Sequence, residues 1–474
     1  MSIVTSFNMM TNKRRYPPLL AYVVFAVGAV GWRLPADALQ PPLPNEAWKS
    51  FTGMSPSAVR AYEIEVMRKV ADLALLPPRV IQSPGPEYDY DQLDYGMTPK
   101  IERTRGGRLW CVWLAGEDGP RAFLLAATSD DNGGTWSKPR LVIDSHSSFL
   151  PLPRTTLGGA LWCDPLGRLW LFTTHGMNYF DGRQGIWAIV CEKPDADSPT
   201  WSAPRRISDG ISLNKPIVLS TGEWLLPTHL LQTHPNHPGE TAVDGTKVSP
   251  YAGPCLDFAR DSRCPGPCVW GLFPELDPYR GVNLLMSTDH GETWTWRSNV
   301  KAPDPDWHEP MVVERRDGSL WMLIRVRGGI METISIDRGL NWSVPRVPAV
   351  LRHPQSRFHL RRLASGRILF VKHGVTIDAH RGRRELSAWL SDDDGETWRG
   401  GLMLDERPAV SYPDAIQAPD GTIYIVHDRE RIALGEILMS RVREEDILAG
   451  RITQPGSQEK RVIIRPLKKK TSKR

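Results

Sequence analysis

The sequence lacks the features that mark several common functional classes. It has no glycine-rich loop of the kind that cradles phosphates, and no basic stretch interleaved with aromatic residues that would indicate nucleic-acid binding. The net charge of +5 does not contradict this, because five positive charges lie in the final seven residues. These are Lys468, Lys469, Lys470, Lys473 and Arg474. We interpret residues 451–474 as a basic C-terminal tail and expect no nucleic-acid partner.

The apolar run near the N-terminus is too short for a stable membrane span. Leu19–Trp32 has fourteen residues, whereas a spanning helix needs about twenty. Lys13–Arg15 precedes the run, and the small-x-small sequence Ala36-Asp37-Ala38 follows it, which is the pattern of an export signal. We predict a signal peptide over residues 1–38 and a periplasmic or extracellular protein. An uncleaved N-terminal anchor is the alternative.

Cysteine is scarce, with six in 474 residues, and no metal-binding pattern is present. Cys255, Cys264 and Cys268 crowd one loop-like segment where a disulfide is plausible, although its pairing is not readable from sequence. The other three cysteines lie in apolar strand-like runs, and we expect buried thiols there. His229, His234, His237 and Glu240 have no recognisable ligand spacing, and Pro235 and Pro238 favour a solvated loop. We expect neither a metal nor another cofactor.

Turn formers and tryptophan, by contrast, are abundant and follow a repeat. The chain has 41 Pro, 40 Gly and 18 Trp, a composition typical of an all-β protein with many turns. A Gly followed by a short apolar strand occurs six times, at intervals of 60, 55, 96, 48 and 55 residues. The repeats begin at Gly107, Gly167, Gly222, Gly318, Gly366 and Gly421. A repeat near fifty residues with several strands each is typical of a propeller blade.

A second motif, Ser-x-Asp-x-Gly-x-Thr-Trp, indicates a hairpin turn, and we call it the Asp box. The Asp side chain is expected to accept turn amide hydrogens, the Gly to take a positive φ, and the Trp to pack between blades. The motif starts at Ser129, Ser287 and Ser391, with a variant at Ser335–Trp342 and a degenerate copy at Asp195–Trp201. It specifies a fold more strongly than an activity.

Together the two motifs predict six four-stranded antiparallel blades in one closed β-propeller. We place the propeller at residues 96–450 and an N-terminal extension at residues 39–95, with a helix from about Ser57 to Leu75. The interval of 96 residues indicates an insertion within His229–Pro278.

The repeat also predicts which residues meet at one end of the central channel. Inner strands start at this end and the second strands return to it, so positions nine before and seven after each repeat Gly gather there. Nine before are Thr98, Gly158, Leu213, Glu309, Arg357 and Tyr412. Seven after are Leu114, Thr174, His229, Arg325, His373 and Asp428. A ring of such charged and polar groups favours a ligand site, and solvated strand ends are the alternative.

With its Asp boxes, its Glu309–Arg325 hairpin and the sequence Ser411-Tyr412-Pro413-Asp414, the chain resembles the sialidase (neuraminidase) superfamily. The resemblance covers roughly residues 97–450 and is greatest to the bacterial secreted branch. It implies a glycan substrate, Tyr412 as nucleophile, Glu309 as its partner, and Arg325 and Arg383 as clamps for the sialic acid carboxylate. Arg384 is the nearest rival of Arg383.

Two positions depart from the family pattern. Met97 stands where the family has an arginine two residues before Pro99, and Ala122–Thr128 lacks the family's catalytic aspartate. Asp118, beside Glu117 on the preceding loop, is the candidate acid/base, and Arg357 is the candidate third clamp. His373 and Asp428 complete the expected substrate-binding set.

These observations predict an exo-acting, sialidase-like glycoside hydrolase that retains anomeric configuration. A tyrosine suits an anomeric centre whose own carboxylate would repel an Asp or Glu nucleophile, and arginine binds a carboxylate bidentately. Two alternatives stay open: a hydrolase or lyase for another acidic sugar such as a uronic acid, and a non-catalytic glycan-binding propeller.

Overall fold

The computed structural model describes residues 68–147, 150, 153–177, 181–231 and 273–467, and in addition 55, 58, 65, 240–241 and 247–248. The predicted export signal, the Cys255–Cys268 segment, His234 and His237, and the lysine-rich end at 468–474 lie outside the described residues.

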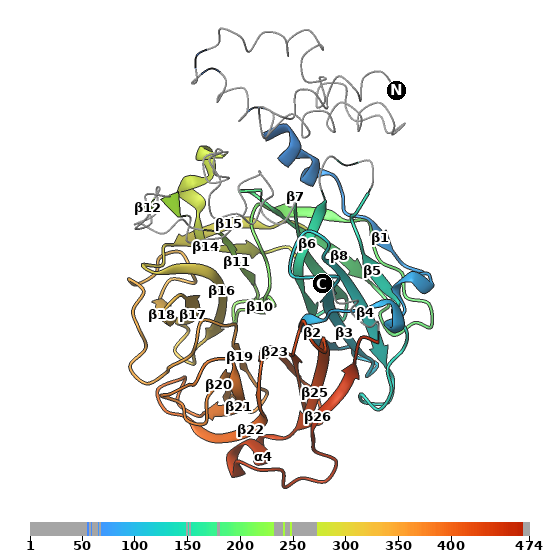
Figure 1. The fold of residues 1–474 in the computed structure, drawn as a ribbon. Helices are drawn as coiled ribbons and strands as arrows, with labels where there is room; N and C mark the ends of the chain where they lie inside the picture. The colour runs from blue at the N-terminus through green and yellow to red at the C-terminus, as the bar shows by residue number, and fades with distance from the viewer. Residues whose placement is uncertain are drawn as a thin grey trace.

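Six antiparallel sheets stand around a central axis, as predicted (Figure 1). Blade 1 has β1 (Val80–Ile81), β2 (Met97–Arg103), β3 (Leu109–Ala115), β4 (Phe123–Ser129) and β5 (Leu141–Ile143). Blade 2 has β6 (Arg154–Cys163), β7 (Leu169–Met177), β8 (Gly185–Cys191) and β9 (Arg205–Ser208). Blade 3 has β10 (Ile217–Val218), β11 (Trp224–Leu230), β14 (Gly281–Ser287) and β15 (Thr295–Val300).

The second half of the ring is built in the same way. Blade 4 has β16 (Pro305–Glu314), β17 (Leu320–Val326) and β18 (Gly329–Ser335). Blade 5 has β19 (His359–Arg362), β20 (Ile368–His373), β21 (Arg384–Ser391) and β22 (Arg399–Pro408). Blade 6 has β23 (Val410–Gln417), β24 (Ile423–Arg429), β25 (Glu436–Val442) and β26 (Gln458–Ile464).

Two blades vary from four strands. In blade 1 the strand β1, from the N-terminal extension, pairs with β5 and adds a fifth strand on the outside. Blade 4 has three strands, and an isolated bridge between Glu332 and Arg346 stands in the place of a fourth. The remaining sheets have the predicted four.

Several short elements lie outside the strands of the blades. Residues 68–72 are helical and lead into the 3-10 turn η2 (Leu73–Leu75). Further 3-10 turns are η3 (Pro86–Tyr88), η4 (Tyr90–Gln92) and η6 (Pro274–Tyr279). The insertion that lengthens one interval to 96 residues lies in blade 3, between β11 and β14. Within it, β12 (Glu240–Thr241) pairs with β13 (Lys247–Val248). The helix α4 (Glu444–Ala449) joins β25 to β26, so blade 6 continues past residue 450, where we had placed its end. Among the described residues, no helix is long and apolar enough to cross a membrane.

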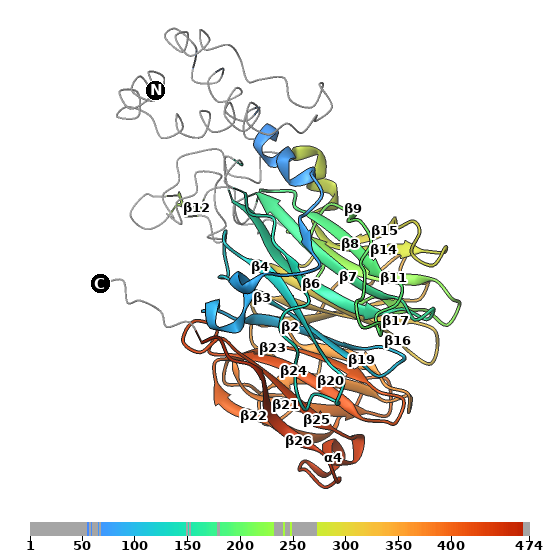
Figure 2. The ribbon, with the colours of Figure 1, turned by 90° about the vertical axis from the view of Figure 1, so that its right-hand side faces the viewer.

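A separate hydrophobic cluster fills each of the six interfaces between neighbouring blades. Blade 1, for example, buries Trp113 against Val426 of blade 6, and blade 4 buries Trp321 against Phe370 of blade 5. The ring closes between its first and last blades. There the amides of Thr98 and Ile101 donate to Asp428 Oδ2 (2.9 Å) and Asp414 Oδ2 (3.0 Å). Two buried carboxylates of blade 6 thus accept hydrogen bonds from backbone amides of the innermost strand of blade 1. Figure 2 shows the ring from the side.

The Asp boxes form the predicted hairpin turns. In blade 5, Ser391 donates to Asp393 (2.8 Å), and the amides of Gly395 and Thr397 donate to Ser391 Oγ and Asp393 Oδ1 (2.8 Å each). The same bonds recur around Asp131, Asp289 and Asp337, where hydrogen bonds, chiefly from the residue four positions later, lower the pKa of the carboxyl to about 2. The degenerate copy differs, since Asp195 binds Thr104 and the amide of Gly106 in blade 1.

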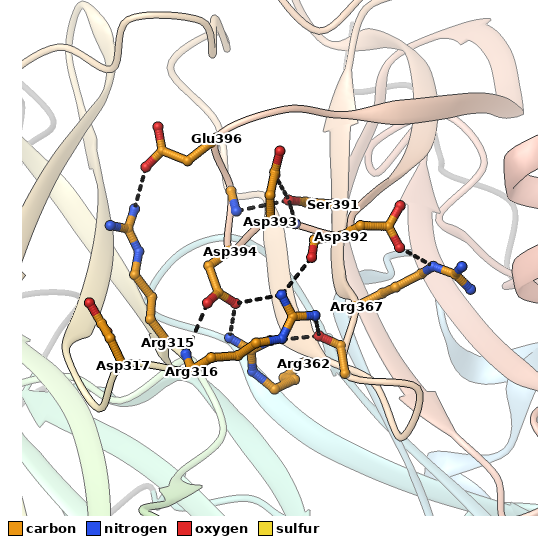
Figure 3. A network of polar contacts seen from close by, with 12 residues as sticks. Arg315, Arg316, Asp317, Arg362, Arg367, Ser391, Asp392, Asp393, Asp394 and Glu396 are labelled. Atoms are coloured by element: carbon orange, nitrogen blue, oxygen red, sulfur yellow. Dashed lines mark hydrogen bonds and ion pairs between the residues drawn. The ribbon is translucent and has the colours of Figure 1, made fainter.

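The Asp box of blade 5 also ties blade 5 to blade 4 (Figure 3). Arg362 Nη2 donates to Asp394 Oδ1 (2.6 Å), and the amide of Arg316 donates to Asp394 Oδ2 (2.9 Å). Arg315 extends toward Glu396, with nitrogen and oxygen 3.7 Å apart. These contacts hold the β16–β17 turn against the neighbouring blade, at the end of the channel remote from Glu309.

Candidate active site

The inner strands bulge where the repeat predicts a ring of functional side chains. The pairing register shifts between Met97 and Lys100, Thr156 and Gly158, His308 and Met311, and Ser411 and Asp414. Of the six predicted ring positions that lie nine residues before a repeat Gly, four have positive φ: Thr98 (50°), Gly158 (126°), Glu309 (41°) and Tyr412 (52°). Bulges re-aim side chains, and strained backbone of this kind concentrates at functional sites.

Glu309 and Tyr412 meet at one guanidinium. Arg325 Nη1 donates to Glu309 Oε2 (2.9 Å) and to the Tyr412 hydroxyl oxygen (3.3 Å), while its Nε lies 2.7 Å from Asp306 Oδ2. In the predicted hairpin Arg325 pairs with His308, one residue from Glu309, which places acid and base side by side. All these side chains are buried.

The electrostatics of this group suit a protonated tyrosine beside an ionised carboxylate. Burial opposes ionisation of Glu309, but the charge and hydrogen bond of Arg325, with smaller contributions from Arg357 and Tyr412, hold the pKa of that carboxyl below its usual range. Burial and the Glu309 charge raise the pKa of Tyr412 to about 12, against the neighbouring arginines. Tyr412 therefore keeps its proton at neutral pH and needs a base to become a nucleophile.

Cations surround the ring of Tyr412. The guanidinium carbon of Arg431 lies 4.5 Å from the ring centroid, that of Arg383 5.9 Å, and Lys100 Nζ 6.0 Å. Arg431 and Arg383 both donate to Ser411 Oγ, at 2.6 and 3.4 Å. Arg384, the other candidate for the role predicted for Arg383, is half exposed, and its Nε lies 3.8 Å from Glu385 Oε1.

Asp118 lies on the β3–β4 loop near this cluster. Its side chain is half-buried. Burial lowers the pKa of Arg431, but electrostatic interactions with nearby groups outweigh this effect and raise the pKa above its usual value. Asp428 contributes most, followed by Tyr412, Tyr95 and Asp118. Asp118 is thus within electrostatic range of the cation that covers Tyr412.

Three predicted substrate-binding residues are placed as supports instead. Arg357 is buried, and its guanidinium binds Asn214 Oδ1 (2.8 Å), Asp414 Oδ1 (3.2 Å) and the Pro413 carbonyl.

His373 and Asp428 also form hydrogen bonds to other groups of the protein. The His373 ring contacts His353 Nε2 (3.1 Å) and the Val410 carbonyl (3.0 Å), and burial lowers its pKa to about 3. Asp428 accepts from the Thr98 amide and, at 3.1 Å, from Arg431 Nε, so it orients Arg431.

Comparison with known proteins agrees with this architecture. The BNR repeat-like domain family matches residues 107–254 and 263–425, about two thirds of the chain. The chain belongs to this family. None of the curated protein sequences matches it significantly.

Solved structures share the BNR-repeat propeller at low identity. The Hadza microbial sialidase Hz136 is 18% identical with a TM-score of 0.53, and the match covers 74% of this chain and 66% of that one. The intramolecular trans-sialidase from Ruminococcus gnavus is 13% identical with a TM-score of 0.54, covering 78% and 98%. The leech intramolecular trans-sialidase is 12% identical with a TM-score of 0.52, covering 79% and 71%. At these identities the likeness establishes the sialidase-like fold.

Sequence reasoning missed two members of this BNR-repeat site. Arg431 belongs to the charged stretch Asp428–Arg431 at the end of β24, which is visible in the sequence as charge beside Tyr412. Lys100 gave a weaker signal, as a lone charge in the inner strand β2. Its Nζ is buried and has no hydrogen-bond partner among the described residues, and burial, then the charge of Arg357, lowers its pKa to about 7.

Proposed function

We propose that this protein is an exo-acting glycoside hydrolase that removes a terminal acidic sugar, foremost sialic acid, with retention through a Tyr412 nucleophile. The observation that carries the proposal is that one nitrogen of Arg325 contacts both the Tyr412 hydroxyl and the Glu309 carboxylate. Because the phenol oxygen accepts a hydrogen bond from Arg325, its own proton remains available to Glu309.

In the first step the Tyr412 oxygen bonds to the anomeric carbon while the glycosidic C–O bond breaks. Glu309 takes the phenolic proton, and Asp118 gives a proton to the leaving oxygen. In the second step water attacks the same carbon, Asp118 takes the water's proton, and the C–O bond to Tyr412 breaks as Glu309 returns its proton. Two displacements at one carbon retain its configuration.

Three arginines around Tyr412 are suited to the carboxylate of the sugar. Arg325, Arg383 and Arg431 come from blades 4, 5 and 6 and converge on one side chain. A carboxylate beside the anomeric carbon is well matched to such donors, since guanidinium groups stay charged and bind it through paired hydrogen bonds. We assign this role to Arg431 in place of Arg357, whose guanidinium already binds Asn214 and Asp414.

The test is hydrolysis of an aryl sialoside by the purified protein and by Tyr412→Phe. We expect release of the aryl group by the parent, and a loss of at least about a thousandfold in kcat/KM for the variant, because the phenylalanine ring has no oxygen to attack the anomeric carbon. Activity that persists in Tyr412→Phe would sink the mechanism. Protein that binds sialosides without cleaving them would instead be a glycan-binding propeller.

One observation favours a second substrate class. Met97, at the first-blade position where an arginine was expected, is 4% exposed and packs in the cluster between blades 1 and 2. Among the described residues, the arginines around Tyr412 therefore come from blades 4 to 6, while blade 1 supplies Lys100, an arrangement that also suits a uronic acid. A panel of uronic-acid glycosides, scored separately for hydrolysis and elimination, distinguishes this substrate from sialic acid.

A further inference from the structure

A cavity lies at the end of the channel opposite the Tyr412 site. It has a volume of about 600 Å3 and opens between blades 2 and 5, beside the turns that follow β6 and β16. Glu309 lies midway along β16 and Glu314 at its end, five residues apart, which separates the cavity from the Tyr412 site by roughly 16 Å.

Buried ion pairs lie between the two sites. Lys215 Nζ lies 3.0 Å from Glu102 Oε2 and 3.3 Å from Asp414 Oδ2, and Asp414 also binds Arg357. These four side chains come from four blades and are almost fully buried. A ligand in this cavity therefore has no direct contact with Tyr412.

One wall of the cavity is basic. Blades 4 and 5 contribute Arg315, Arg316, Arg361 and Arg362 to its lining. Arg316 and Arg362 share Asp394, as Figure 3 shows, and each also donates to the carbonyl of Gly366. The side chain of Arg361 forms no hydrogen bond or ion pair with any residue in the described part of the chain, and the buried Nε of Arg315 has no acceptor there.

The acidic groups of the cavity offset only part of this charge, because the lining holds two carboxylates, Asp164 and Glu314, and four arginines. Both oxygens of Glu314 accept hydrogen bonds from Ser220, from its amide and its hydroxyl at 2.7 Å each. Asp164 accepts from two backbone amides and from the side chains of Arg168 and Trp170. Asp164 is thus paired with Arg168 and Glu314 keeps its charge, and the cavity lining as a whole remains positive.

The other wall is apolar. Blades 2 and 3 supply Trp162, Pro165, Pro216, Ile217 and Val218. Val218 is 40% exposed, so this wall is reached from solvent. A cavity with an apolar wall and a few convergent charged groups is typical of a small-molecule site.

We propose that this cavity binds a small amphiphilic anion: a carboxylate, sulfonate or phosphate monoester joined to an aromatic or aliphatic body. The anionic group contacts Arg361 and Arg315, and the apolar body lies against Pro216–Val218. The site is independent of the proposed hydrolase reaction.

A fluorescent pair of probes tests the proposal with the full-length chain. 8-Anilinonaphthalene-1-sulfonate combines an anionic group with an aromatic body, and N-phenyl-1-naphthylamine has the same body without the charge. We expect saturable binding of one sulfonate probe per chain, weakened by added salt, and at least about tenfold weaker binding of the neutral probe.

Variants on both walls locate the site. Arg361→Met and Val218→Glu should each raise the Kd of the sulfonate probe at least about tenfold. Arg451→Met, at an exposed arginine beyond α4, should not change it, nor should Tyr412→Phe. Arg361 has no ion pair to lose, so its variant should keep the parent melting temperature, which circular dichroism checks.

Three results would overturn the proposal. The first is an unchanged Kd in Arg361→Met, and the second is equal affinity for the charged and neutral probes. The third is displacement of the sulfonate probe by inorganic phosphate at equal concentration, since this would show that the apolar wall contributes nothing.

Discussion

The guanidinium of Arg431 lies over the face of the Tyr412 ring, 4.5 Å from its centroid. The two residues belong to one blade, and Ser411 and Asp428 hold the arginine in place through hydrogen bonds of 2.6 and 3.1 Å. A cation in this position can both stabilise a developing phenolate and bind an anionic substrate. Four predictions follow from this site and its scaffold.

Replacing Arg431 should weaken substrate binding more than it slows chemistry. In Arg431→Met we expect KM for an aryl sialoside to rise about tenfold to a hundredfold, the effect of one charge-assisted contact, with a smaller fall in kcat. Steady-state kinetics measures both constants. Arg384→Met is the matched control, because Arg384 is half exposed and directed at Glu385, and its kinetics should equal those of the parent. A change in kcat alone would contradict the carboxylate role.

Asp118 can be tested through the leaving group. An acid that protonates the leaving oxygen matters little when that oxygen leaves readily as a nitrophenolate, and much when it belongs to a sugar. Asp118→Asn should therefore lose at least about a hundredfold in kcat/KM, which reports the first step, on a sialyl-lactose but less than about tenfold on a 4-nitrophenyl sialoside. An equal loss on both substrates would remove Asp118 from the acid role.

Lys100 should make stability depend on pH. Its pKa of about 7 in the folded protein lies below the ordinary value of 10.5, so between these values the unfolded chain binds a proton that the folded protein lacks. The folded state is penalised fully below pH 7, and the penalty disappears as the pH rises to about 10.5. Lys100→Met should thus be more stable than the parent at neutral pH, by a margin that shrinks by about 1 kcal/mol per pH unit above 7. Urea unfolding at pH 7, 8 and 9 measures this margin, and a constant margin would contradict it.

Gly395 of the blade 5 Asp box should tolerate no side chain. Its φ is +97°, and a Cβ there would lie 2.7 Å from the Trp321 ring of blade 4. Gly222 has nearly the same φ, +98°, with nothing within 4 Å of such a Cβ. We expect Gly222→Ala to cost about 1–2 kcal/mol of unfolding free energy, and Gly395→Ala to cost about 1–3 kcal/mol more through overpacking. Equal losses by chemical denaturation would show that Trp321 moves aside freely.

Features that depend on short-range interactions can be predicted from the sequence alone. Each Asp box closes its hydrogen bonds within eight residues, so Ser391, Asp393 and Thr397 are readable in order along the chain. The hairpin that joins Glu309 to Arg325 is equally local. Its turn sets the register in which the two strands pair, and this register places Arg325 beside Glu309. Six such units with apolar strands imply a closed ring, and the structure confirms one.

The set of charged groups that reach Tyr412 depends on contacts in the folded protein that the sequence does not reveal. Arg357 and Tyr412 share a position in the repeat, yet Asp414 and Asn214 bind the Arg357 guanidinium within the channel. Arg431, two residues beyond β24, turns over the tyrosine because Asp428 and Ser411 bind it there. Such outcomes depend on bulges and on contacts between blades that are far apart in sequence, and no local pattern contains them. Lys100 shows the same limit, since only closure of the ring buries its amine beneath Tyr412 without a partner.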